Sequence, residues 1–246
     1  MLRSATLARQ RRQRGLSIVE LMVGVAIGLF VVAAATMLVS TQLSDNRRLM
    51  LETQVQQDLR ASADIITREL RRAGHWSMAR AGVWYQRTPP VVVETNPYLV
   101  QIKPTAADDS VFVDDVPETS IVFAYSRSGK EVDAGNATVS GFRLAQVDGK
   151  GVIQTQLGED NWQALTDGNT LNVTEFTVTM NRQPIRLECA KPCPGPDPNE
   201  CKPILEVRNI TVFIKGRPAN DATVERSIRS NVRLRNDTVI AGTCPE

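Results

Sequence analysis

The sequence predicts an α+β protein, with one long N-terminal helix followed by a β-rich globular domain. Two helical patterns in succession, an apolar run and then an amphipathic stripe, fill the chain up to Ala73. After Gly74 the pattern changes to short β-branched runs separated by turn residues. Roughly 170 residues follow, which is ample for one hydrophobic core.

The helix begins with an apolar run, residues 16–39, whose only charged residue is Glu20. As a helix this run rises roughly 36 Å, enough to cross a hydrocarbon core of about 30 Å. Residues 1–15 before it contain Arg3, Arg9, Arg11, Arg12 and Arg14 and no acid. Because Lys and Arg cluster on the cytoplasmic side of membrane segments, we expect a cytoplasmic N-terminus, one pass through the inner membrane and a periplasmic C-terminal domain.

The junction between leader and apolar run carries a recognisable motif. A carboxylate inside a membrane-length segment is costly, so Glu20 indicates a function and a specific partner. The run Arg14-Gly15-Leu16-Ser17-Ile18-Val19-Glu20 resembles the cleavage and methylation motif of type IV pilins and type II secretion pseudopilins. The resemblance implies that a prepilin peptidase cuts between Gly15 and Leu16 and N-methylates Leu16. It also implies that Glu20 pairs with the terminal amine of a neighbouring subunit during filament assembly.

Two other interpretations of this segment account for fewer of its features. A secretory signal peptide would be cleaved near Ala33-Ala34-Ala35, but the apolar run is long for that and contains Glu20. A plain membrane anchor leaves both Glu20 and the Gly15 boundary unexplained. Gly24 and Gly28 form a small-xxx-small pair that lets helices approach closely in lipid, although glycine is also simply common in membrane helices. Leu16 departs from the Phe that starts most mature pilins, but it is similarly apolar.

The charge balance depends on the leader. The whole chain has 29 Lys and Arg against 27 Asp and Glu, a formal net charge of +2. Without the five leader arginines the count is 24 against 27, a net charge of −3. The basic balance therefore gives no argument for nucleic-acid binding.

An amphipathic continuation of the helix is predicted over residues 40–74. Apolar and small residues recur at spacings of three and four, the pattern of a helix with one buried face. These residues are Val55, Leu59, Ser62, Ile66, Leu70 and Ala73. Gly74 is the predicted C-terminal stop. With the apolar run, residues 16–73 would form one helix of roughly 87 Å.

The remaining residues, 75–246, predict a β-rich periplasmic domain. Strands are expected at 91–93, 98–102, 120–125, 139–147, 171–180, 205–214 and 228–234. Turns are expected at Pro89-Pro90, Ser128-Gly129, Asp148-Gly149 and Asp167-Gly168. The order of strands in the sheet does not follow from these patterns.

Two further stretches narrow the resemblance. Residues 58–61 with 68–75, and Val232-Arg233-Leu234-Arg235-Asn236 near the C-terminus, look like the helix end and the closing strand of PilW-type minor pilins. The resemblance implies a minor pilin that helps to initiate pilus assembly at the tip, serving twitching and attachment. Its implied partners are the prepilin peptidase, other minor and major pilins, membrane lipid and a tip adhesin. Residues 76–200 match nothing recognised.

Two alternative functions are also consistent with the sequence. A type II secretion pseudopilin of the J type shares the N-terminal motif and the plan of a long helix with a sheet. A membrane-anchored periplasmic binding module would use the helix only as a tether. Retention of residues 1–15 on the mature protein would favour the binding module.

Four cysteines lie beyond the membrane segment, at Cys189, Cys193, Cys201 and Cys244. Three of them fall in a proline-rich loop, residues 189–201, which has little else to pack. An even number in an oxidising compartment predicts two disulfides, one inside the loop and one reaching Cys244, although three pairings are possible. A Cys₄ zinc site is the alternative, but spacings of three and then seven residues fit zinc ribbons poorly.

No motif for catalysis is present in the sequence. There is one histidine, His75, and no P-loop, dinucleotide fingerprint or Gly-x-Ser-x-Gly. Asp108-Asp109 and Asp114-Asp115 could bind calcium but lack the glycine-centred loop of an EF-hand. We therefore expect a non-enzymatic filament component without cofactor or metal.

Overall fold

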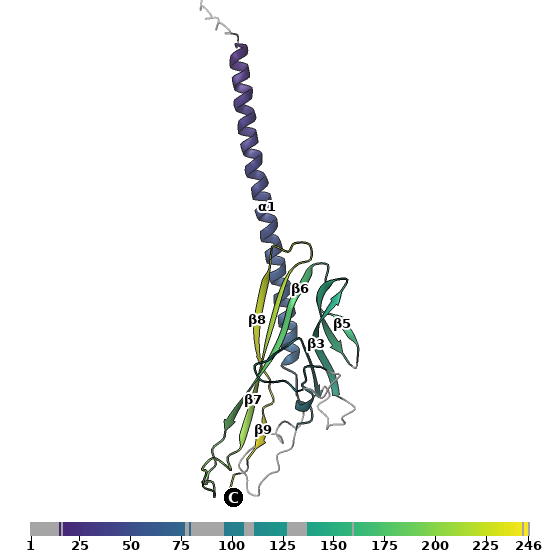
Figure 1. The fold of residues 1–246 in the computed structure, drawn as a ribbon, viewed down its shortest axis with the longest axis vertical. Coiled ribbons are helices and arrows are strands. Elements are labelled where there is room, and N and C mark those ends of the chain that lie inside the picture. Colours follow the sequence, from purple (N-terminus) through teal and green to yellow (C-terminus); the bar gives the residue numbers. More distant parts are fainter. Residues whose placement is uncertain are drawn as a thin grey trace, which may run out of the picture. The chain divides into compact units, whose positions relative to one another are not determined.

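A computed structural model describes Gly15 and residues 17–76, 79, 96–105, 111–126, 137–158, 160–242 and 244–245. Within these residues it confirms the α+β fold (Figure 1), with a long helix, α1 (Ile18–Leu70), and a short 3₁₀ helix, η1 (Leu99–Gln101). The observed helix is thus a few residues shorter at each end than the predicted helix, residues 16–73. The chain divides into two compact units, residues 1–49 and 50–246.

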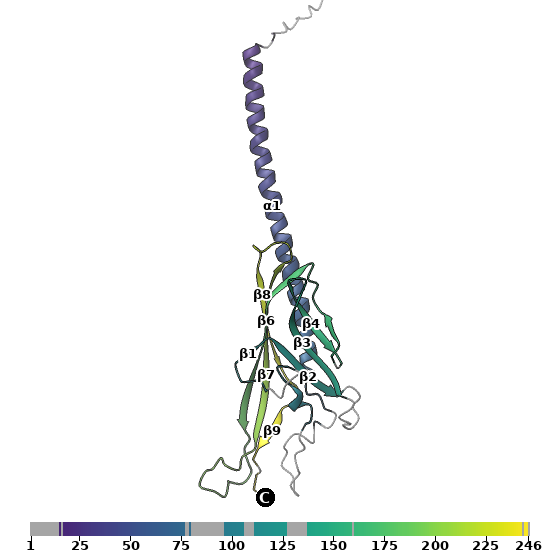
Figure 2. The ribbon, with the colours of Figure 1, turned by 45° about the vertical axis from the view of Figure 1, so that its right-hand side comes forward.

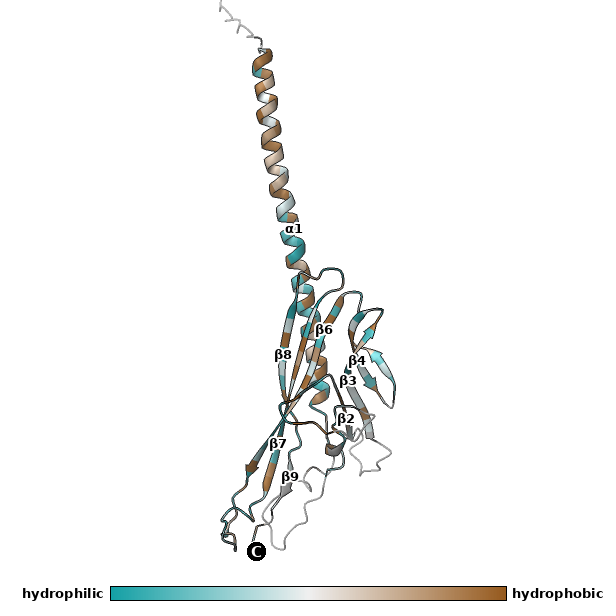
Figure 3. Cartoon of the chain, in the orientation of Figure 1, coloured by the Kyte–Doolittle hydropathy of each residue, from teal (hydrophilic) through white to brown (hydrophobic). Residues whose placement is uncertain are grey.

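The first unit contributes the N-terminal half of α1. Every described residue from Ile18 to Leu49 is exposed. Apolar residues predominate along most of the visible side of this half of the helix (Figure 3). The helix is long and apolar enough, by length and composition, to cross a membrane.

The second unit contains two antiparallel sheets (Figure 2). The larger has the order β1-β6-β7-β8, with β9 also pairing with β7, and the smaller has the order β2-β3-β4-β5. Their bounds are β1 Pro117–Glu118, β2 Ser120–Ser126, β3 Ala137–Val147, β4 Lys150–Leu157, β5 Trp162–Ala164, β6 Leu171–Arg186, β7 Ile204–Pro218, β8 Arg226–Arg233 and β9 Thr238–Ala241.

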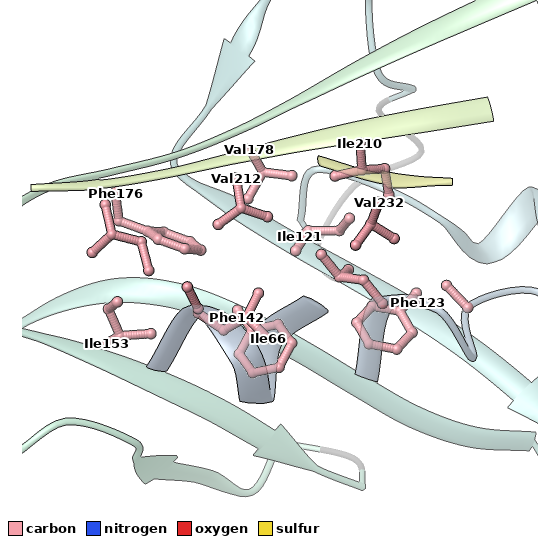
Figure 4. Packing of buried hydrophobic residues seen from close by; sticks show 14 of the residues in the cluster. Ile66, Ile121, Phe123, Phe142, Ile153, Phe176, Val178, Ile210, Val212 and Val232 are labelled. Carbon is pink, nitrogen blue, oxygen red and sulfur yellow. The ribbon is translucent and has the colours of Figure 1, made fainter. Parts of the chain in front are cut away.

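The core lies between these sheets and the part of α1 that belongs to the second unit. All six residues of the predicted stripe are buried, with Ile66 and Leu70 fully so. In Figure 4, Ile66 lies beside Phe142 of β3, and Phe176 and Val212 of the larger sheet lie across from them. Burial of this stripe explains why the period-3.6 pattern was a reliable signal.

The two sheets meet where β4 begins. The Gly151 amide donates a hydrogen bond to Asn172 Oδ1 at 2.9 Å. A Cβ atom at Gly151 would lie 1.9 Å from the Val173 carbonyl oxygen, so this close approach requires glycine.

Several strand predictions were confirmed and others were wrong. The predicted strands at 120–125, 139–147, 171–180, 205–214 and 228–234 correspond to β2, β3, β6, β7 and β8, of which β6 and β7 are longer than expected. The strand predicted at 98–102 is wrong, because residues 99–101 form η1, with the Asn96 side chain accepting the Tyr98 amide at 3.0 Å. Strands β1, β4, β5 and β9 were not predicted. The strand at 91–93 and the turns at Pro89-Pro90 and Ser128-Gly129 lie outside the described residues.

The β6–β7 hairpin forms an arm that extends past the end of α1 (Figures 1 and 2). Its connecting loop contains the disulfide Cys193–Cys201, and Cys189–Cys244 ties the loop to the C-terminus. This pairing confirms one bridge inside the loop and one to Cys244. It does not fit a Cys₄ zinc site, since a disulfide sulfur is not a thiolate ligand.

Candidate assembly helix and the Gly74 junction

The N-terminal end of α1 places Glu20 in its first turn. The Leu21 amide donates to the Ser17 carbonyl at 3.1 Å, so Ser17 occupies the cap position. Ser17 and Glu20 have the spacing of a capping box, and a carboxylate near a helix N-terminus is favoured by the helix dipole. Glu20 therefore suits the local helix as well as an external partner. Leu16, the expected first residue of the mature chain, lies outside the described residues.

The apolar half of α1 has a surface that the described chain leaves uncovered. Ile18 and Phe30 are each 78% exposed, although both side chains are strongly apolar. A Cβ atom at Gly24 or Gly28 would meet no other atom within 4 Å. The fold of the subunit thus gives no packing reason for glycine at these positions, which is consistent both with close approach of another helix and with the general frequency of glycine in membrane helices.

Gly74 lies at the junction between α1 and the β domain, four residues after the end of the helix. Gly74 has a φ of +70°, and a Cβ atom there would lie 2.6 Å from Leu99 Cδ2. Its carbonyl accepts two side-chain amides, from Asn96 at 2.8 Å and from Asn236 at 2.6 Å. Its own amide donates to the Ala124 carbonyl at 2.9 Å.

This junction joins the two stretches that the sequence analysis singled out near the helix end and the C-terminus. Asn236 ends the Val232–Asn236 stretch, and Gly74 ends the helix segment that begins near Arg68. Their contact across 162 positions of sequence could not be inferred from either stretch alone. The hydrogen bond joins the segment that follows α1 to the segment between β8 and β9.

Two acidic residues of α1 interact with charged residues of the β domain. Glu52 forms an ion pair with Arg226 at the start of β8, with 2.6 Å between Oε2 and Nη2. Asp58 is only partly exposed, and that burial together with the charge of Asp167 raises the pKa of its carboxyl. The Asp58–Asp167 pair is thus a local repulsion between α1 and the turn before β6.

The remaining candidate residues have structural partners. Asp114 pairs with Arg182 at 2.8 Å, and Asp115 accepts a hydrogen bond from Asn181 at 3.0 Å. Asp108 and Asp109 lie outside the described residues. His75 is exposed rather than packed, and its carbonyl accepts the Ser126 amide. In the described part of the chain no three His, Cys, Asp or Glu side chains gather as metal ligands.

Comparison with known families decides the class of this protein. Residues 10–36 match the prokaryotic N-terminal methylation motif. Residues 48–234, more than half of the chain, match the family described as prepilin peptidase-dependent protein B. The chain belongs to the prepilin peptidase-dependent protein B family. No curated protein and no solved structure matches it.

The family membership identifies a minor pilin-like protein with a type IV pilin N-terminus. It points to a prepilin peptidase and to other pilins as partners, and it is compatible with anchoring by a single apolar helix. The match to the prepilin peptidase-dependent protein B family includes all of residues 76–200, the region for which the sequence patterns gave no resemblance.

Proposed function

We propose that this protein is a minor pilin of the PilW type, which enters a type IV pilus through its N-terminal helix and helps to initiate assembly at the tip. The observation that carries the proposal is the uncovered apolar half of α1, preceded by a processing motif in register. Assembly buries this surface against other pilin helices. The role is structural rather than enzymatic, and it requires no cofactor.

Processing would prepare the helix for assembly. The prepilin peptidase hydrolyses the peptide bond between Gly15 and Leu16, which removes the leader and its five arginines. The new Leu16 amine is then methylated and lies four residues from Glu20. Glu20 of one subunit pairs with the terminal amine of its neighbour. Because a buried carboxylate is tolerated only when paired, this contact selects the register of the stacked helices.

The first test is the intact mass and N-terminal sequence of the protein purified from membranes of a host that contains its prepilin peptidase. We expect a chain that begins at N-methylated Leu16, and a chain that begins at Met1 from a host without the peptidase. A chain starting at Met1 in both hosts would replace the pilin mechanism with an anchored binding module. A chain starting at Thr36 would indicate a secretory signal peptide.

A second test addresses the role of Glu20. Substitution E20Q removes the charge and keeps the shape, so cleavage and folding should be retained while incorporation into filaments falls about tenfold. A charge pair at about 4 Å is worth roughly 4 kcal/mol at an effective dielectric of about 20, of which desolvation offsets much. Incorporation is measured by immunoblot of sheared filaments. The control is E69Q, on the same helix beside Arg72, which should assemble as the parent does.

The J-type pseudopilin shares the processing motif, and a genetic readout separates it from the pilus assignment. Deletion of the gene should abolish surface pili and twitching while protein secretion through the outer membrane continues. Loss of secretion with normal piliation would assign the protein to the secretion system. Binding of a tip adhesin is tested in the parent strain by co-purification of the protein with sheared pili.

A further inference from the structure

Strand β8 forms one edge of the larger sheet. In Figures 1 and 2 it lies at the margin of that sheet, on the side of β7 away from β6. It pairs with β7 in an unbroken register, from Gly216↔Arg226 to Asn209↔Arg233. A long, regular edge strand presents unpaired N–H and C=O groups to which another strand can bind.

The hydrogen bonds between β7 and the end of β8 show which backbone groups point away from the sheet. The Leu234 amide, one position beyond β8, donates to the Arg208 carbonyl at 3.0 Å, and this pair continues the β7–β8 register. Hydrogen-bonded pairs occur at every second residue of an antiparallel ladder. The even-numbered residues of β8 therefore bond to β7, and the odd-numbered residues point their N–H and C=O groups outward. The outward residues are Ser227, Arg229, Asn231 and Arg233. In the described part of the chain no group hydrogen-bonds to their outward backbone atoms.

The exposed face of β8 carries a cation that attracts acidic side chains. The Arg229 guanidinium lies over the Phe213 ring of β7, with 5.6 Å between its central carbon and the ring centroid. Among the described residues no carboxylate pairs with Arg229, whereas the two other arginines of β8 already form ion pairs. Opposite charges directly across two strands stabilise their pairing. A strand bound at this edge is therefore favoured when it places an acidic residue opposite Arg229.

The inward face of β8 favours apolar neighbours instead. Ile228 is half-buried and packs against the core, and Val232 is fully buried. An added strand would place its inward side chains beside Ile228, where apolar residues extend the core. A second copy of β8 fits poorly, because this strand contains no acidic residue and would bring two Arg229 side chains onto one face.

We propose that the outer edge of β8 binds an extended segment of another protein, in which acidic and apolar residues alternate. The segment continues the sheet as an antiparallel strand, as all the strands paired in this sheet do. Backbone hydrogen bonds provide affinity, and the alternation of side chains provides selection. This contact is made by the β domain, so it goes beyond the helix packing of the proposed function and does not rest on it.

The test uses the full chain in detergent micelles and a synthetic probe, an end-blocked peptide of eight residues in which Glu and Val alternate. Amide hydrogen exchange is measured by NMR. In the free chain the amides of Arg229 and Asn231 should exchange rapidly, whereas β7 protects those of Ser230 and Val232. Peptide at about 100 times its Kd should slow exchange at Arg229 and Asn231 about a hundredfold. If these two amides are instead protected without peptide, increasingly so at higher protein concentration, a second copy occupies the edge and the proposal is wrong.

Modified peptides test whether the backbone makes the contact. In antiparallel pairing the residue opposite Arg229 turns its own N–H toward β8, so methylation of the Glu nitrogens removes the donors. That peptide should bind at least about tenfold more weakly by calorimetry, as expected for loss of hydrogen bonds. Methylation of the Val nitrogens, which face solvent, should leave the Kd unchanged. Equal binding of the two methylated peptides would exclude strand addition.

Variants of the chain test the edge and its charge. R229E should reverse the preference, so that a Lys-Val peptide binds more tightly than the Glu-Val peptide, while R71E, at an exposed arginine just after α1, should bind as the parent does. N231P removes an outward N–H and should stay folded, since proline is tolerated on edge strands, yet lose peptide binding. If N231P does not fold, R229E and the methylated peptides still decide. An unchanged preference in R229E, or no saturable binding of the Glu-Val peptide to the parent, overturns the proposal. None of these results depends on filament assembly.

Discussion

Two charge pairs between α1 and the β domain have opposite effects on the stability of their packing. Glu52 attracts Arg226, whereas Asp58 faces the like charge of Asp167. One pair favours the observed packing and the other opposes it. Surface charge pairs are individually weak, yet a repulsion of this kind makes stability depend on pH.

Substitution D58N should stabilise the protein at neutral pH. The pKa of Asp58 is raised in the folded state, first by partial burial and then by Asp167. The charged form therefore costs stability as the pH rises through that pKa, and the cost is absent below the pKa of the unfolded chain. Thermal unfolding should show a higher midpoint for D58N at pH 7, with no difference from the parent in strong acid. D64N, at an exposed aspartate of α1, should leave the midpoint unchanged at both pH values.

Substitution G74A should destabilise the protein more than G149A does. Both glycines have a φ near +70°, where a side chain costs about 1–2 kcal/mol. At Gly149 a Cβ atom meets open space, whereas at Gly74 it would press on Leu99. Overpacking of a core typically adds about 1–3 kcal/mol, which should appear in denaturant unfolding as the difference between the two variants. An equal loss of unfolding free energy in G74A and G149A would show that the Leu99 side chain moves aside without cost.

At the scale of secondary-structure elements, sequence patterns predicted those elements whose burial follows one period. The stripe of α1 and the alternating strand β7 are of this kind, with Ile210, Val212 and Ile214 buried in turn. Asp148-Gly149 was also predictable, because both residues have positive φ in a two-residue hairpin turn.

The elements that were missed lack such a period. Strand β4 contains Gly151, Gln154 and Gln156, and its place is set by pairing with β3 and by contact with β6 rather than by its own propensity. The run at 98–102 is apolar enough for a strand, but the Asn96 side chain fixes a turn before it. The hydrogen bond between Asn236 and Gly74 could not be predicted, because the two residues are far apart in sequence.

The arm formed by β6 and β7 should depend on its two disulfides to different degrees. The Cys189–Cys244 bridge spans 55 positions and Cys193–Cys201 spans 8. In the chain-entropy view a longer loop gives more stabilisation, so removal of the long bridge should cost about 2–4 kcal/mol. We expect the C189S/C244S double variant to unfold at lower denaturant than C193S/C201S. The reverse order would locate most of the stabilisation inside the loop itself.

At the scale of the whole molecule, the surface proposed for assembly is separate from the residues that form the core. Every buried residue of α1 lies between Val55 and Leu70. The exposed large apolar residues of the helix lie mostly before that segment, from Ile18 to Met50. A monomer in water would bury nothing along this first half, whereas lipid or neighbouring helices would cover it. The second unit, by contrast, contains a complete core of its own.

This separation predicts that residues 50–246 fold without the rest of the chain. The fragment keeps the whole buried stripe of α1, both sheets and all four cysteines, and it loses most of the exposed apolar surface. Produced in an oxidising compartment, it should be soluble and monomeric, with one cooperative unfolding transition near the midpoint of the full chain in detergent. A fragment of residues 74–246 is the control. It lacks the stripe that covers Phe142 and Phe176, so it should aggregate. If the longer fragment aggregates as well, the first half of α1 contributes to folding and the division between assembly and folding is wrong.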